Sequence, residues 1–143
     1  VILGAGPDAR AAAREFARLG VASLAILASD RVTAERAKPE AAGTTVYARS
    51  LTDPLGNTLL ERADLVLRLD KSARVDDSLL GPHLTVIDLA DTGVSDLRSR
   101  AIALGALTFN RRDVEAHRFE LALSQILGGT VGLEPILTLF HGL

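Results

Sequence analysis

Short apolar runs alternate along this chain with segments whose apolar residues recur every three or four positions. Continuous apolar runs are typical of strands buried on both faces, and the wider spacing is typical of amphipathic helices. Strand and helix patterns alternate from end to end, which predicts an α/β fold. We expect a doubly wound, mainly parallel, six-stranded sheet with helices on both faces. The expected strands cover residues 1–3, 24–27, 44–47, 65–67, 85–87 and 106–109.

Capping and turn residues set the ends of the expected helices. Gly20 and Gly105 follow two helical patterns as C′ residues do, and Ser95 and Asp113 are suitable N-caps. The stretch TDPLGN before residue 58 has turn chemistry. The expected helices cover residues 8–19, 33–38, 57–63 and 95–104, then a long segment between Asp113 and Gly128, and finally residues 133–142.

A glycine turn joins the first expected strand to the first expected helix, in the stretch VILGAGPDAR. The spacing Gly4-x-Gly6-x-x-Ala9 is that of a loop that binds a dinucleotide. Gly4 would allow a tight turn, Gly6 would let a diphosphate approach the backbone, and Ala9 would let the helix pack closely. We therefore predict that Gly4, Ala5, Gly6, Ala9 and Arg10 bind a cofactor.

The next two residues give an alternative interpretation of this turn. Pro7 removes one N–H group, although proline is tolerated in the first turn of a helix. Asp8 places a carboxylate where the helix would favour a bound anion, so it could compete with a phosphate. Arg10 could offset that charge by pairing with Asp8 or by reaching the ligand. The alternative is a self-capped loop that keeps the fold without the ligand.

The end of the second strand bears on which dinucleotide would bind. Asp30 stands where an acidic residue commonly accepts hydrogen bonds from the adenosine ribose and repels a 2′-phosphate. Arg31 could instead attract that phosphate. Ser29 or Asp30 could equally be the N-cap of the next helix. The expected cofactor is NAD or NADP, with NAD preferred.

The length of 143 residues suits a single Rossmann-like domain over residues 1–143, without repeats or a linker. The chain begins at Val1 and contains no methionine, and its first strand has only three residues before Gly4. A central strand usually has about five or six residues. We expect this domain to be part of a longer protein, with a segment upstream. A short first strand after modest trimming is the alternative.

The composition excludes several other functions. A net charge of −2 and 3% aromatic residues do not favour binding to nucleic acid or to an anionic membrane. The chain has no cysteine, and its three histidines have no metal-binding spacing. No apolar run approaches the ~18 residues that span a bilayer. We expect a soluble, cytoplasmic protein without a metal site.

With these features in order, the chain resembles the C-terminal, cofactor-binding half of the shikimate/quinate dehydrogenase family. The resemblance covers nearly the whole chain. Residues 4–6 and 9–11 match the family's GAGGAARA loop, and residues 63–66 match the start of its ADLVxNATP segment. Residues 86–89 resemble the strand with its VxDxxY motif, and residues 119–121 resemble its FELWTG helix.

The departures from the family lie where its members bind ligands. The family's NRT, which binds the 2′-phosphate of NADP, is replaced by residues 28–30, Ala-Ser-Asp. Its NATP loop is replaced by residues 68–71, Arg-Leu-Asp-Lys. Asp91 replaces the tyrosine of VxDxxY, and Val114 replaces a glutamine that touches substrate. The family's catalytic lysine and aspartate belong to an N-terminal domain, so we expect no catalytic residue here.

The resemblance implies an NAD(P)-binding oxidoreductase domain that transfers hydride between nicotinamide and a hydroxyl or keto ring acid. Its partners would be the dinucleotide and a missing N-terminal substrate domain, in quinate metabolism or aromatic amino acid biosynthesis. The alternative is a catalytically inactive domain with a regulatory or structural role, as in fungal quinate repressors that resemble this family. A different family with the same glycine pattern is a third interpretation.

Overall fold

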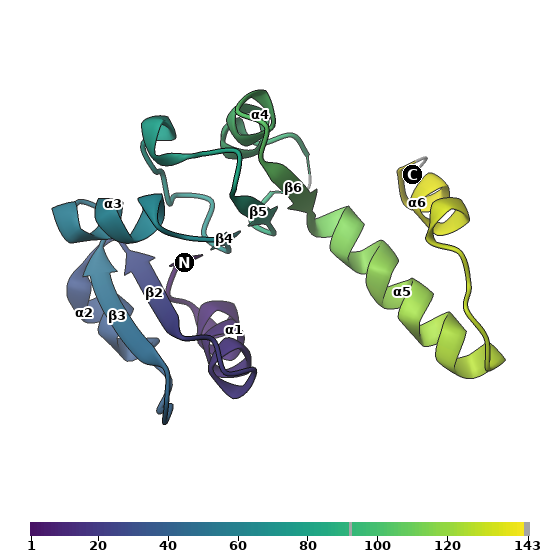
Figure 1. Ribbon diagram of the computed structural model, residues 1–143, viewed down its shortest axis with the longest axis horizontal. Helices are drawn as coiled ribbons and strands as arrows, with labels where there is room; N and C mark the ends of the chain where they lie inside the picture. The colour runs from purple at the N-terminus through teal and green to yellow at the C-terminus, as the bar shows by residue number, and fades with distance from the viewer. Residues whose placement is uncertain (92, 142–143) are drawn as a thin grey trace.

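The six predicted strands form one sheet in which every neighbouring pair is parallel, in the order β3-β2-β1-β4-β5-β6 (Figure 1). The structure is a computed structural model that describes residues 1–91 and 93–141. The parallel strands and their order confirm the prediction of a doubly wound α/β fold. The strands are β1 (Ile2–Leu3), β2 (Ser23–Ala28), β3 (Thr45–Ser50), β4 (Leu65–Arg68), β5 (Thr85–Asp88) and β6 (Leu107–Asn110).

Helices cover both faces of this sheet because the crossovers before β3 pack on one face and those after β3 pack on the other. The helices are α1 (Pro7–Arg18), α2 (Arg31–Arg36), α3 (Pro54–Glu61), the 3-10 turn η1 (Asp77–Leu79), α4 (Asp96–Ala103), α5 (Arg111–Leu127) and α6 (Leu133–His141). One core cluster lies under α1 and α2, and the other lies under α3, η1 and α4. The central strands supply both clusters, with Ile2 in one and Leu3 in the other. The two halves of the sheet, β1–β3 and β4–β6, meet between β1 and β4.

Three helices begin two or more residues earlier than the sequence predicts. In α3, Asp53 caps the helix by accepting the Leu55 N–H at 2.9 Å, so TDPLGN contains a helix start and not only a turn. In α5, the N-cap is Asn110, and Asp113 returns a bond to the Asn110 N–H as the third residue of a capping box. In α2, Asp30 caps a helix that starts at Arg31. Each polar cap lies before the apolar pattern begins, which explains the late predictions.

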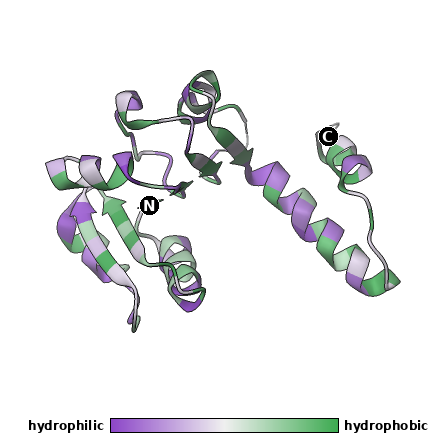
Figure 2. Ribbon diagram, in the orientation of Figure 1, coloured by the Kyte–Doolittle hydropathy of each residue, from purple (hydrophilic) through white to green (hydrophobic). Residues whose placement is uncertain are grey.

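The long helix α5 leaves the sheet after β6, and α6 packs back along it (Figure 1). The last residue of the helix expected over 133–142 lies outside the described residues. The central strands are mainly hydrophobic, whereas α5 carries many hydrophilic residues along its length (Figure 2). Ile126 and Leu127, at the far end of α5, are largely exposed. Within residues 1–91 and 93–141, no helix has the length and apolar character that crossing a membrane requires.

Candidate functional site

The turn after β1 has a conformation that only glycine adopts easily. Gly4 has a φ of +124°, and its N–H donates to the Leu27 carbonyl at 2.8 Å. A Cβ at this position would stand 3.1 Å from Asp70 Cβ and 3.3 Å from Asp70 N. Gly4 is therefore needed for its backbone angle and for the close approach of the segment that follows β4.

The N-terminus of α1 differs from those of the helices around it. Side chains cap α2, α3, α4 and α5, whereas Gly6 begins α1 with no side-chain cap. The N–H groups of Asp8 and Ala9 have no acceptor among the described residues. Unpaired amides at a helix N-terminus, together with the helix dipole, favour a bound anion.

A hollow of about 240 Å³ lies beside this helix end, lined by Ala5, Gly6, Pro7, Arg10, Ala11 and Arg14. A Cβ on Gly6 would meet no atom within 4 Å, so the glycine leaves open space next to the free amides. Arg10 and Arg14 are exposed and have no acidic partner among the residues described. Ala9 is buried and packs α1 closely on the sheet.

Asp8 does not fill this hollow. Its side chain is exposed and makes no hydrogen bond or ion pair with any described residue, Arg10 included. Asp8 instead lines a second hollow of about 260 Å³ between α1 and α5, which Val114 and Arg118 also line. Neither the self-capped loop nor the Arg10–Asp8 pair is therefore the arrangement found.

Asp30 and Arg31 lie at the carboxyl end of β2, at the start of α2. Asp30 accepts the Thr33 N–H at 2.8 Å and the Thr33 hydroxyl at 2.7 Å, and Ser29 donates to it at 3.2 Å. The bonds from Thr33 hold the pKa of this exposed carboxyl below its usual range. Arg31 Nε lies 3.8 Å from Glu35 on the surface of α2. Of the two interpretations of Asp30, the N-cap is confirmed, and its carboxylate is still accessible to solvent.

A buried ion pair joins the carboxyl ends of β4 and β5. Arg68 Nη1 donates to Asp88 Oδ2 at 2.9 Å, and the two side chains are 9% and 2% exposed. Asp88 also accepts the Ala90 N–H at 3.1 Å and the Ser95 hydroxyl. Ser95 in turn caps α4 through the Arg98 N–H, as its sequence position predicts.

The sequence did not single out Arg68 and Asp88 as partners. A detectable signal exists, because each is a charged residue that ends an apolar run, and parallel strands end at the same edge. The strand register places Arg68 directly beside Asp88.

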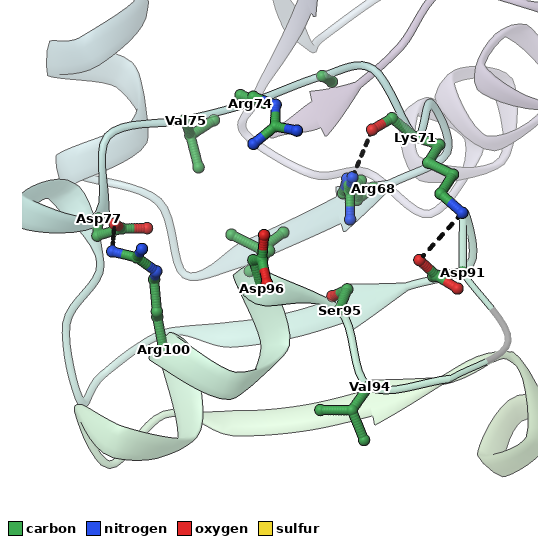
Figure 3. A pocket seen from close by; sticks show the side chains of 12 residues that line it. Arg68, Lys71, Arg74, Val75, Asp77, Asp91, Val94, Ser95, Asp96 and Arg100 are labelled. Carbon is green, nitrogen blue, oxygen red and sulfur yellow. Dashed lines mark hydrogen bonds and ion pairs between the residues drawn. The ribbon is translucent and has the colours of Figure 1, made fainter.

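Arg68 and Ser95 of this network also line a third hollow, of about 340 Å³, between the segment after β4 and α4 (Figure 3). Lys71 Nζ lies 3.6 Å from Asp91 at its rim, and Arg100 pairs with Asp77 across from them. The residues that replace the family's NATP loop and its tyrosine therefore lie together. Most of the charges in this hollow are paired with one another.

The geometry brings Gly4, Gly6 and Asp70 to the junction of the two halves of the sheet. In sheets of this strand order, ligands bind outside the carboxyl ends at that junction. Asp70 is exposed, and hydrogen bonds from the Ser72 side chain and N–H hold the pKa of its carboxyl below its usual range. Two acidic residues therefore lie near the glycine turn, Asp8 in the first turn of α1 and Asp70 against Gly4.

Neither a protein-family model nor a curated protein matches this sequence. Solved structures share its fold. The ligand-free 5-ketofructose reductase of Gluconobacter sp. strain CHM43 is 24% identical, with a TM-score of 0.71 over 99% of this chain and 55% of its own. Quinate dehydrogenase from Corynebacterium glutamicum, in complex with NAD, is 18% identical, with a TM-score of 0.71 over 99% and 54%.

Shikimate 5-dehydrogenase from Listeria monocytogenes, in complex with shikimate and NAD, is 17% identical, with a TM-score of 0.72 over 96% of this chain and 54% of its own. The fold is therefore that of one part of these shikimate/quinate-type dehydrogenases and of the reductase. The chain spans about half the length of each of these proteins.

Proposed function

We propose that this chain is the NAD(P)-binding domain of an oxidoreductase of the shikimate/quinate dehydrogenase type. The observation that carries the proposal is the uncapped N-terminus of α1, which opens beside the Gly4–Gly6 turn at the junction of β1 and β4. A diphosphate is the anion that this position receives in sheets of this order. The likeness of fold to dehydrogenases supports the same conclusion.

The residues at the turn fit a dinucleotide diphosphate. The N–H groups of Asp8 and Ala9 would donate to its oxygens, and the space beside Gly6 would hold it close to the backbone. Arg10 would neutralise part of its charge from the rim of the hollow. When bound, the nicotinamide would supply hydride transfer with a hydroxyl or keto ring acid. The role of the described residues is to bind and orient the dinucleotide.

The carboxylate of Asp30 supports NAD over NADP. Its charge is fixed at the end of β2 by Thr33 and Ser29, and it is exposed where the adenosine half of the cofactor would lie. A negative charge there repels a 2′-phosphate, whereas a free ribose hydroxyl could donate to it. Arg31 is nearby, but its weak pairing with Glu35 directs it along the surface of α2.

The remaining half of such an enzyme would bind the ring acid and supply the acid–base groups. The solved dehydrogenases are nearly twice as long as the part that matches this chain, which leaves room for that half. The regulatory alternative has one observation in its favour. The residues that replace the family's NATP loop and its tyrosine are already paired within this chain, Arg68 with Asp88 and Lys71 with Asp91.

The test is a titration of the folded chain with NADH and NADPH, followed by nucleotide fluorescence and by thermal stability. Gly6→Ala should weaken NADH binding by about tenfold or more, because its methyl group would enter the space that the diphosphate needs. Its melting temperature without ligand should change little, since nothing lies within 4 Å of the added Cβ.

Gly129→Ala is the matched control, because its Cβ would also meet nothing within 4 Å but lies after α5. It should leave binding unchanged. A chain that neither binds nor is stabilised by millimolar dinucleotide would exclude the proposed function, since a ligand of the native state must raise its stability.

A further inference from the structure

Arg68 donates two further hydrogen bonds, both to the segment that packs against the glycine turn. Besides its bond to Asp88, its Nε donates to the Asp70 carbonyl at 3.3 Å. Its Nη2 donates to the Lys71 carbonyl at 2.6 Å, the bond drawn in Figure 3. One buried guanidinium therefore connects β5 to the two residues that follow Leu69. Few side chains other than arginine could do this, because its planar head carries five donors in a fixed fork.

The segment that Arg68 holds also lies against the glycine turn that precedes α1. The N–H groups of Leu69 and Asp70 both donate to the Leu3 carbonyl, at 2.9 and 3.2 Å. Asp70 then lies against Gly4, within 3.1 Å of the position of a Cβ. The position of residues 69–72 thus depends on β1 from one side and on Arg68 from the other.

We propose that Arg68 is a positioning residue that fixes residues 69–72 as the second wall of the dinucleotide crevice. This inference rests on the proposed function, and it concerns the half of the ligand that would lie over β4–β6. In this strand order each half of the sheet takes one mononucleotide, with the diphosphate between them. Arg68, held by Asp88, would thereby affect the binding of the mononucleotide that lies over β4–β6 without contacting it.

A comparison of ADP and NADH binding distinguishes this positioning role of Arg68 from an effect on stability alone. ADP carries the adenosine half and the diphosphate, whereas NADH also carries the half that would pass residues 69–72. Arg68→Lys keeps a positive charge near Asp88 but cannot serve a carboxylate and two carbonyls together. It should weaken NADH binding by about tenfold and ADP binding by less than about twofold.

Ser95→Ala is the matched control. It removes another donor to Asp88 and the cap of α4, whereas the hydrogen bonds of Ser95 lead to Asp88, Arg98 and Ser99 and not to residues 69–72. It should lower the melting temperature and leave the ratio of NADH to ADP affinity unchanged. If Arg68→Lys does not fold, the double variant Arg68→Gln/Asp88→Asn removes both charges together and is compared in the same way.

Hydrogen exchange gives a readout that needs no ligand. Amide exchange in residues 69–73 should be faster in Arg68→Lys than in Ser95→Ala, because only the first variant frees the Asp70 and Lys71 carbonyls. Equal exchange in the two variants, or equal losses of NADH and ADP affinity in Arg68→Lys, would overturn the inference. If the unaltered chain binds neither ligand, the proposed function itself fails, and the role of Arg68 toward a cofactor fails with it.

Discussion

The two halves of the sheet end very differently at their carboxyl edge. After β1, the chain presents glycines, an uncapped helix and a hollow beside free amides. After β4 and β5, it presents a buried arginine, a buried aspartate and a serine that is already used as a helix cap. The first junction leaves backbone amides open to a ligand because side chains are missing there, whereas at the second junction the buried polar side chains bond to one another.

We therefore expect the β1 junction to determine ligand affinity and the β4–β5 junction to determine the stability of the fold. At the β1 junction a small change of shape should alter ligand affinity and leave stability nearly intact, since a Cβ on Gly6 would touch nothing. At the β4–β5 junction a change should act first on stability, because Asp88 is 2% exposed and accepts three hydrogen bonds. Variants at each junction test this division.

Asp88→Ala should have the largest effect. It would leave the Arg68 guanidinium buried without its carboxylate, and breaking a buried pair in this way costs about 3–5 kcal/mol of unfolding free energy. Asp77→Ala is the matched control, because Asp77 pairs with Arg100 at the surface, where side-chain exposures are 38% and 59%. An exposed pair contributes at most about 1 kcal/mol.

Denaturant unfolding of both variants measures the two free energies. If Asp88→Ala and Asp77→Ala lost the same stability, the β4–β5 junction would not be the supporting half, and the contrast between the two junctions would be wrong.

Much of this architecture could be predicted from the sequence, and the misses share one cause. Apolar runs located five of the six strands, because a parallel strand covered on both faces has no polar positions to obscure it. The edge strand β3 was located by its β-branched residues, and its more polar end, residues 48–50, was not predicted. Helix starts were placed late at Asp53 and Asn110, where the polar cap lies well before the apolar pattern, whereas Ser95 was identified as the cap of α4. A hydrophobic pattern carries no information about residues that lie outside it.

The site was predicted less completely for a related reason. The glycine turn follows from local spacing, so Gly4 and Gly6 could be identified from the chain alone. The Arg68–Asp88 pair depends on the register of two strands separated by 20 positions, which a single sequence does not give. Whether Asp8 would turn back onto its own helix was also open, since both rotamers satisfy the same pattern.

Asp8→Ala should change affinity at the open junction. Asp8 places a negative charge at the N-terminus of α1 without occupying the hollow, so its removal should favour a bound diphosphate. A charge near a helix end is worth about 0.3–1 kcal/mol, which corresponds to about a twofold to fivefold gain in NADH affinity at low salt.

The gain should shrink as salt rises, because exposed charges are screened. Glu15→Ala removes a carboxylate from the far end of the same helix, where it pairs with Arg18, and should leave the affinity unchanged. Weaker binding by Asp8→Ala, measured by nucleotide fluorescence, would mean that its carboxylate assists the ligand and does not compete with it.

The smallest effect should come from Asp30, an exposed carboxylate that contrasts with the buried Asp88. Hydrogen bonds from Thr33 hold the pKa of Asp30 below its usual value, so its ionised form stabilises the folded chain. That stability is fully present above the pKa of the unfolded chain, about 3.9, and is lost as the pH falls through the lower folded pKa.

Asp30→Asn keeps a capping oxygen without the titration. Its melting temperature should therefore lie slightly below that of the unaltered chain at pH 7 and converge with it toward pH 3. Thr33→Val, which removes the hydroxyl donor and keeps the N–H, should show part of this pH dependence. If the melting temperatures of Asp30→Asn and of the unaltered chain differed by the same amount from pH 7 to pH 3, the carboxylate charge would have no part in capping α2.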